Sequence, residues 1–324
     1  MRRTMFRRTV TAAGVGILAL GAACSSPALP QGSGAHEAPA PPAVVAPVGT
    51  SVPPFADPSP VPPQELPLGG RSILPDHLVI ADYGSSGGAA LGVLGVGSPD
   101  EAAEAVTRRA QLYTSFGRRV QPAMELIATV ALSSPGPDGT YSSRGDLDAV
   151  QRYLDAAHHH HELLILDFQP GRGDYLPEVA RFEKFLIDPS VGVALDPEWN
   201  VGRGEVPGQV IGSSSAAQIN AVSTYLSGLV AAHDLPDKLF VVHQFRTTML
   251  PDRDQITQAP GLETVLHADG FGAQTTKIAV YHALAIPIPP FHPALKLFLT
   301  QDTNMMSPQQ VMALNPPPEM ITYQ

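Results

Sequence analysis

Carboxylic side chains follow several short apolar segments of this sequence, at the point where each segment ends. They are Asp82, Asp167, Asp196, Glu198, Asp269 and Asp302. Carboxylates gathered in one place repel one another, so the pKa of at least one rises and a general acid becomes available. The sequence therefore holds the side chains for acid–base chemistry, provided that the fold brings them together.

Asp196 and Glu198 form the most specific of these patterns. Residues two apart on an extended chain point the same way, and Pro197 stiffens the turn between them. Trp199, the only tryptophan, could stack on the apolar face of a sugar ring or pack between elements. We expect Glu198 to be a general acid. Asp196 or Asp167 would then be a nucleophile, a general base or a stabiliser of positive charge.

Further polar residues at segment ends are candidates for binding substrate hydroxyl groups. They are Asp82, Arg172, His243, Gln244, Asp269 and Asp302, with Trp199 beside them. Asp82 and Asp302 have a second interpretation, because aspartates often cap a following helix or turn. Arg172 could contact an anionic substrate or pair with Asp174 in its own loop.

Histidines make a metal site the weaker alternative. His243, His267 and Asp269 could bind an ion, with Asp167 or Asp196 as a further ligand. No H-E-x-x-H or C-x-x-C is present, and no G-x-G-x-x-G follows the first apolar segment. The four histidines at 158–161 are interpreted as a solvated helix end. We therefore expect neither a metal nor another cofactor.

Eight apolar segments rich in Val, Ile and Leu alternate with helix-like segments. They are 78–82, a part of 124–132, 163–167, 191–196, 239–244, 264–269, 295–300 and 320–323. Continuous apolar runs are typical of parallel strands that are buried on both faces. Eight of them within residues 76–324 predict an α/β fold, a (β/α)8 barrel that lacks its last helix. Such a barrel gathers the carboxylates at its C-terminal mouth.

The first 23 residues carry the features of an export signal. Arg2, Arg3, Arg7 and Arg8 precede a short apolar core, 15–20, that is too short to span a bilayer. Leu20–Cys24 resembles a bacterial lipoprotein cleavage site, which implies lipidation of Cys24 and a membrane anchor on the extracytoplasmic face. An ordinary secretory signal would release the chain instead. The paired arginines also fit a twin-arginine signal, so the export route stays open.

Residues 24–75 hold 14 of the 34 prolines. Proline fixes φ and removes a hydrogen-bond donor, so we expect a partly disordered tether between the anchor and the barrel. Removal of the signal leaves 16 basic against 30 acidic side chains, a net charge of −14. A surface of that sign repels phosphate backbones, which argues against a nucleic-acid partner.

Several segments resemble a family of secreted actinobacterial proteins that are usually labelled lipoproteins or hypothetical proteins. They are 125–130, 167–172, 194–199, 241–245 and 267–272. This resemblance spans nearly the whole barrel and implies location and fold more than chemistry. More loosely, Asp82, Asp196-x-Glu198 and the closing Tyr323-Gln324 are similar to the lysozyme family of barrel muramidases, which has an Asp after its first strand and a D-x-E pair after its fourth.

Together these features predict a lipid-anchored barrel that binds or cleaves cell-wall or other extracellular glycan. A non-catalytic glycan-binding or scaffold lipoprotein is the first alternative, and it would pair its carboxylates with Arg172 or other cations. A metal-dependent hydrolase is the weaker alternative, and it would bring His243, His267 and Asp269 around one ion.

Overall fold

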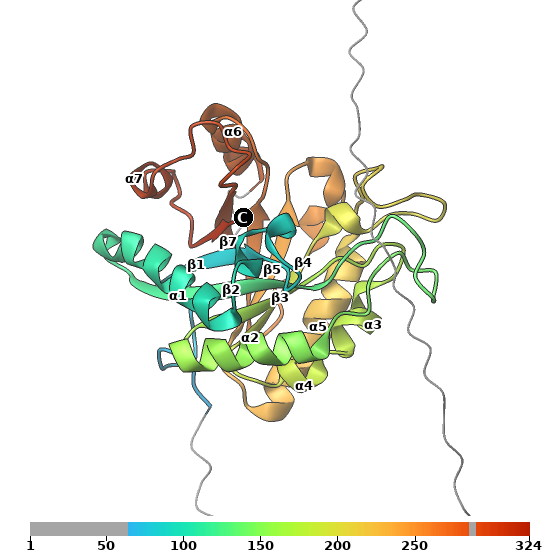
Figure 1. The fold of residues 1–324 in the computed structure, drawn as a ribbon, viewed down its shortest axis with the longest axis horizontal. Helices are drawn as coiled ribbons and strands as arrows, with labels where there is room; N and C mark the ends of the chain where they lie inside the picture. The colour runs from blue at the N-terminus through green and yellow to red at the C-terminus, as the bar shows by residue number, and fades with distance from the viewer. Residues whose placement is uncertain (1–63, 285–289) are drawn as a thin grey trace, which may run out of the picture. The chain divides into compact units, whose positions relative to one another are not determined.

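The computed structural model describes residues 64–284 and 290–324, which form a closed barrel of parallel strands (Figure 1). Each strand pairs with the next along the chain, and the last strand closes on the first. The strands are β1 His77–Gly84, β2 Arg119–Thr129, β3 Leu163–Phe168, β4 Val191–Leu195, β5 Lys238–Gln244, β6 Leu262–Ala268, β7 His292–Leu297 and β8 Met320–Tyr323. The predicted (β/α)8 barrel is confirmed.

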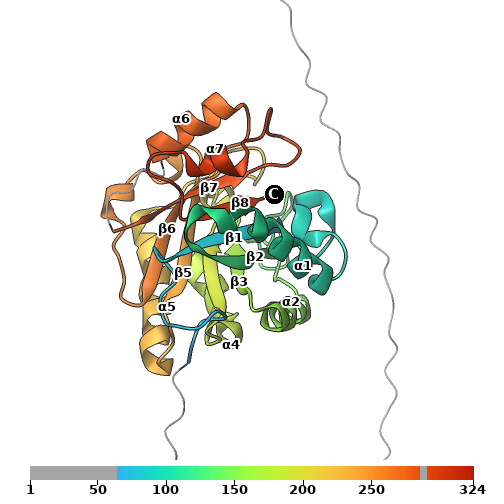
Figure 2. The ribbon, with the colours of Figure 1, turned by 90° about the vertical axis from the view of Figure 1, so that its left-hand side faces the viewer.

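Helices surround the barrel in the connections between strands (Figure 2). They are α1 Pro99–Ala110, α2 Leu147–His160, α3 Tyr175–Ala180, α4 Glu183–Leu186, α5 Ala216–His233, α6 Gln274–Leu284 and α7 Pro308–Met312. Ser98, Ser215 and Ser307 each form a capping box at a helix N-terminus. The connection between β3 and β4 holds two short helices, α3 and α4. None of the described helices is long and apolar enough to cross a membrane.

Side chains alternate between the barrel interior and the surrounding helices. Val79, Ile165 and Val241 belong to the cluster that fills the lower interior. Their strand neighbours, such as Leu164 and Phe240, belong to the larger core beneath the helices. This period of two decides which residue at a strand end reaches the mouth and which one faces a helix.

The floor of the barrel is closed by residues that precede β1. Leu66, Ile73 and Leu74 are buried and belong to the interior cluster. Glu263 accepts hydrogen bonds from the backbone N–H of Ile73 at 2.7 Å and from the hydroxyl of Ser72 at 2.8 Å. The folded barrel therefore begins earlier than the predicted boundary at residue 76, because an open floor would expose the apolar interior. The predicted signal, Cys24 and the tether as far as residue 63 lie outside the described residues.

Candidate active site

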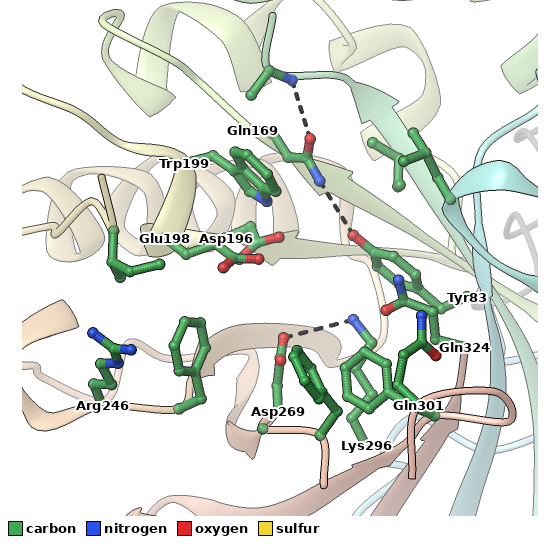
Figure 3. Close-up of a pocket in the computed structure, with 18 of the residues that line it drawn as sticks. Tyr83, Gln169, Asp196, Glu198, Trp199, Arg246, Asp269, Lys296, Gln301 and Gln324 are labelled. Atoms are coloured by element: carbon green, nitrogen blue, oxygen red, sulfur yellow. Dashed lines mark hydrogen bonds and ion pairs between the residues drawn. The ribbon is translucent and has the colours of Figure 1, made fainter. Parts of the chain in front are cut away.

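The C-terminal mouth of the barrel holds a cavity of about 640 Å³. This volume is within the range of small-ligand sites. Its polar wall includes Tyr83, Gln169, Asp196, Glu198, Asp269, Lys296, Gln301 and Gln324, and its rings are those of Trp199, Phe245, Phe271 and Phe298. Figure 3 shows Asp196 and Glu198 on one side and Asp269 on the other, with their carboxyl groups directed into the space between them.

The end of β4 places the predicted acid pair. Asp196 follows the last residue of the strand, and residues Pro197–Trp199 form one turn of 3-10 helix. The carbonyl of Glu198 accepts the N–H of Gly212 at 2.7 Å, which fixes the turn against the loop that follows it. Both carboxyl groups and the ring of Trp199 line the cavity, as the sequence predicted.

Burial and mutual repulsion keep protons on this pair. Burial, followed by the charges of Glu198 and Asp167, raises the pKa of Asp196 well above its usual value. Burial, followed by the charge of Asp269, raises the pKa of Glu198 to about 7. Neither carboxyl group has a salt bridge within residues 64–284 and 290–324. Glu198 can therefore carry a proton at neutral pH, which is the property of a general acid.

Asp269 has the opposite electrostatic environment. Its Oδ2 lies 3.0 Å from Nδ1 of His243 and 3.6 Å from Nζ of Lys296. Burial alone would raise the pKa of Asp269, but the Lys296 ammonium and His243 outweigh burial and hold that pKa well below its usual range. The cavity thus contains an ionised carboxylate that faces a protonated one.

A buried chain of side chains beneath the cavity supports Asp269. His243 Nε2 lies 2.8 Å from Oε1 of Glu125, and Thr322 donates to Oε2 of the same glutamate at 2.9 Å. Burial opposes a charge on His243, yet Glu125 and the hydrogen bond to Asp269 raise its pKa well above the usual value. Burial and the neighbouring His243 lower the pKa of His267 to about 3. His243 is therefore the cation and His267 the neutral partner, with their Nδ1 atoms 3.0 Å apart.

The residues of the metal alternative do come together. Donor atoms of His243, His267 and Asp269 all lie within 4.8 Å of one another in the buried interior. The cations His243 and Lys296 already balance the anions Glu125 and Asp269, and the Lys296 ammonium would repel a second cation. Hydrogen bonds and ion pairs account for most donors of the cluster, while the buried Nε2 of His267 has no hydrogen-bond partner among the described residues.

Asp167 lies beneath Tyr83 and is not part of the cavity wall. The Tyr83 hydroxyl donates to Oδ2 of Asp167 at 2.8 Å, and Gln169 donates to that hydroxyl at 3.3 Å. The Lys296 ammonium lies 3.4 Å from the centroid of the Tyr83 ring. Asp167 therefore holds Tyr83 in place, and it is less suited to attack a substrate than Asp269.

Two predicted binding residues point to the outer face of their strands and do not reach the mouth. Asp82 lies on the outer face of β1 and forms a salt bridge with Arg109 of α1. Gln244 also points outward, and its amide donates to the carbonyl of Arg246 at 3.0 Å. Its neighbour His243, also a predicted binding residue, points into the barrel but is fully buried beneath the cavity and does not line it.

Loop contacts keep two further predicted binding residues, Asp302 and Arg172, out of the cavity wall. Asp302 pairs with Lys277 at 3.0 Å and accepts the N–H of Phe298 at 2.9 Å. Arg172 donates to the carbonyl of Glu205 at 2.7 Å and lies over the ring of Tyr141. The turn-capping interpretation of Asp302 is confirmed, and Arg172 pairs with none of the mouth carboxylates.

The sequence reasoning missed several residues of the site, above all Glu125 and Lys296. Each is a charged residue flanked on both sides by apolar residues of its strand, at a position that alternation directs inward. That pattern was the available signal, because a buried charge needs a partner and is rarely placed in a barrel interior without a function.

A scan of the chain against protein-family models finds no match, and no curated protein is significantly similar to it.

Proposed function

We propose that the protein is a glycoside hydrolase that acts on cell-wall or other extracellular glycan. The observation that carries this proposal is the pairing of Glu198 with Asp269 across one ring-lined cavity. Pairs of carboxyl groups whose environments push their pKa values apart can divide acid and base roles between them.

Each carboxyl group has a distinct role in the proposed reaction. Glu198 donates its proton to the glycosidic oxygen, and the leaving sugar departs with the electron pair of the broken bond. Asp269, already ionised, faces the positive charge that develops on the sugar, and either bonds to it or activates a water molecule. Asp196, buried and protonated, adds no negative charge beside Glu198.

The wall of the cavity suits a sugar better than a charged or wholly apolar ligand. Trp199, Phe245 and Phe298 offer flat apolar surfaces for the faces of pyranose rings. Gln169 and Gln301 provide donors and acceptors for hydroxyl groups. Binding modes that combine rings with a few amides are typical of concave ligand sites.

The same proposal includes export and anchoring. The arginine-rich segment before residues 15–20 and the small residues before Cys24 support a lipidated N-terminus outside the cytoplasm. The proline-rich segment up to residue 63 would separate the barrel from the membrane.

Release of reducing ends tests the proposed activity. Residues 59–324, which form one compact unit, would be incubated with actinobacterial cell-wall fractions and a panel of soluble polysaccharides. We expect release by the native fragment and by Asp174→Asn, which removes an exposed carboxylate, and loss of release in Glu198→Gln and Asp269→Asn. Binding without release in the native fragment would instead favour the non-catalytic glycan-binding alternative, for which the Asp269–Lys296 ion pair is the supporting observation.

A further inference from the structure

A second cluster of metal-type donors lies on the outside of the barrel, where α1 and α2 run side by side (Figures 1 and 2). Asp100 belongs to the first turn of α1, and His159 and His160 belong to the last turn of α2. Asp100 and His159 are 59 positions apart in the sequence, so no local pattern joins them. The packing of the two helices creates the cluster.

The distances within the cluster match those around a small tetrahedral ion. Oδ1 of Asp100 lies 3.2 Å from Nδ1 of His159 and 3.3 Å from Nε2 of His160. The three donor atoms all lie within 4.8 Å of one another. Ligands that are each about 2.0–2.1 Å from a tetrahedral zinc ion lie roughly 3.3 Å apart. The two separations from Asp100 therefore fit such an ion.

Hydrogen bonding does not fully account for this arrangement. The Nε2 atom of His160 is shielded from solvent and has no hydrogen-bond partner among the described residues, although it lies 3.3 Å from the carboxylate of Asp100. A buried nitrogen without a partner is unfavourable. An ion placed between the imidazole and the carboxylate would satisfy both groups.

The neighbouring histidines have other environments. Nε2 of His158 lies 3.0 Å from Oδ2 of Asp188 and not against Asp100. His161 follows the helix in the left-handed conformation and carries no side-chain contact to Asp100. The packing of α1 against α2 therefore selects His159 and His160 from the four histidines at 158–161 and places them beside Asp100.

We propose that Asp100, His159 and His160 bind a divalent transition-metal ion, of which zinc fits the donor set and spacing best. The side chains of Asp100 and His159 are largely exposed, so a fourth coordination position faces solvent. The ion links the N-terminus of α1 to the C-terminus of α2 and has no contact with the mouth. This inference is independent of the proposed hydrolase activity.

Zinc binding by residues 59–324 tests the proposal. The fragment lacks Cys24, the only thiol, and would be purified without a histidine tag. Titration calorimetry with ZnCl2 would compare the native fragment with Asp100→Asn and His160→Gln, and with the matched controls His158→Gln and His161→Asn. We expect Asp100→Asn and His160→Gln to lose one equivalent of zinc or to bind it about tenfold or more weakly, and the controls to bind as the native fragment does.

Thermal unfolding separates loss of the ion from loss of the fold. Zinc should raise the Tm of the native fragment and leave that of Asp100→Asn unchanged, while the two proteins should have similar Tm values without zinc. An ion bound in the barrel interior would persist in Asp100→Asn and disappear in His267→Gln. Equal zinc affinity in Asp100→Asn and the native fragment, or no binding by the native fragment, would overturn the proposal.

Discussion

Glu198 and Asp269 face each other across the mouth cavity with opposite electrostatic environments (Figure 3). Burial and the negative charge of Asp269 raise the pKa of Glu198 to about 7. The Lys296 ammonium and His243 overcome burial and lower the pKa of Asp269. The negative charge of Asp269 thus helps to keep the proton on Glu198. The pair therefore has the protonation states of an acid catalyst before a substrate binds.

The dependence of kcat/KM on pH should report both groups. Activity needs a protonated Glu198, so we expect it to fall as the pH rises through about 7. Activity also needs an ionised Asp269. Because the pKa of Asp269 is lowered, kcat/KM should fall on the acidic side only at a pH below the usual pKa range of carboxyl groups. If the residual activity of Glu198→Gln still falls as the pH rises through about 7, a group other than Glu198 causes that fall.

Lys296→Met removes the main cation beside Asp269. We expect kcat/KM to fall by about 100-fold or more, and the acidic limb to move to higher pH, because Asp269 then gains a proton more readily. Asp174→Asn serves as the control and should show the native profile. A Lys296→Met profile with an unmoved acidic limb would show that Lys296 does not set the ionisation of Asp269.

Glu125→Gln should destabilise the barrel at neutral pH. Burial opposes ionisation of Glu125, but His243 and the other nearby cations lower its pKa to about 2. A lowered pKa contributes stability above the unfolded value of 4.5 that disappears as the pH falls toward 2. Removing one partner of a buried pair costs about 3–5 kcal/mol. Urea unfolding at pH 7 should show this difference, and it should shrink in acid.

Glu162 should have the opposite pH dependence. Burial between α1 and α2 raises its pKa to about 8. As the pH rises, Glu162 loses its proton near pH 4.5 in the unfolded chain but only near pH 8 in the folded protein. The free energy of unfolding should therefore fall between pH 4.5 and 8 by up to about 1.4 kcal/mol per pH unit. Glu162→Gln should remove this slope, whereas Glu104→Gln, on an exposed face of α1, should keep it. Parallel native and Glu162→Gln curves across this range would contradict the expectation.

The barrel floor should contribute to stability. Leu74 is buried among the interior residues of the strands, so Leu74→Ala should cost about 2–5 kcal/mol of unfolding free energy. Leu112→Ala, at a leucine that is 57% exposed, is the matched control and should change little. Equal chemical-denaturation midpoints for both variants would mean that residues before β1 do not close the barrel.

The sequence predicted the barrel well because parallel strands and capped helices have local signatures. The apolar runs specified all eight strands, and the Ser-Pro pairs at Ser98 and Ser307 marked two helix starts. The site was harder to predict, because a one-residue change in register exchanges the inner and outer faces of a strand. Asp82 was expected in the mouth and faces α1, while Tyr83 beside it reaches the cavity.

Partners from distant strands could not be read from local patterns. The ionisation of Asp269 depends on Lys296 of β7 and His243 of β5, and that of His243 depends on Glu125 of β2. Closure of the barrel brings these residues together, and their spacing along the chain does not predict these contacts. The sequence therefore identified Asp196 and Glu198 as a pair and left the role of Asp269 among several binding candidates.

A carboxyl-carbon NMR titration of residues 59–324 measures the ionisation of Glu198 and Asp269 directly. Signals would be assigned from Glu198→Gln and Asp269→Asn. The structure predicts that the Glu198 signal titrates near pH 7, while the Asp269 signal shows an ionised group down to the acid limit of the folded state. Titration of both groups near their usual values, about 4, would contradict it.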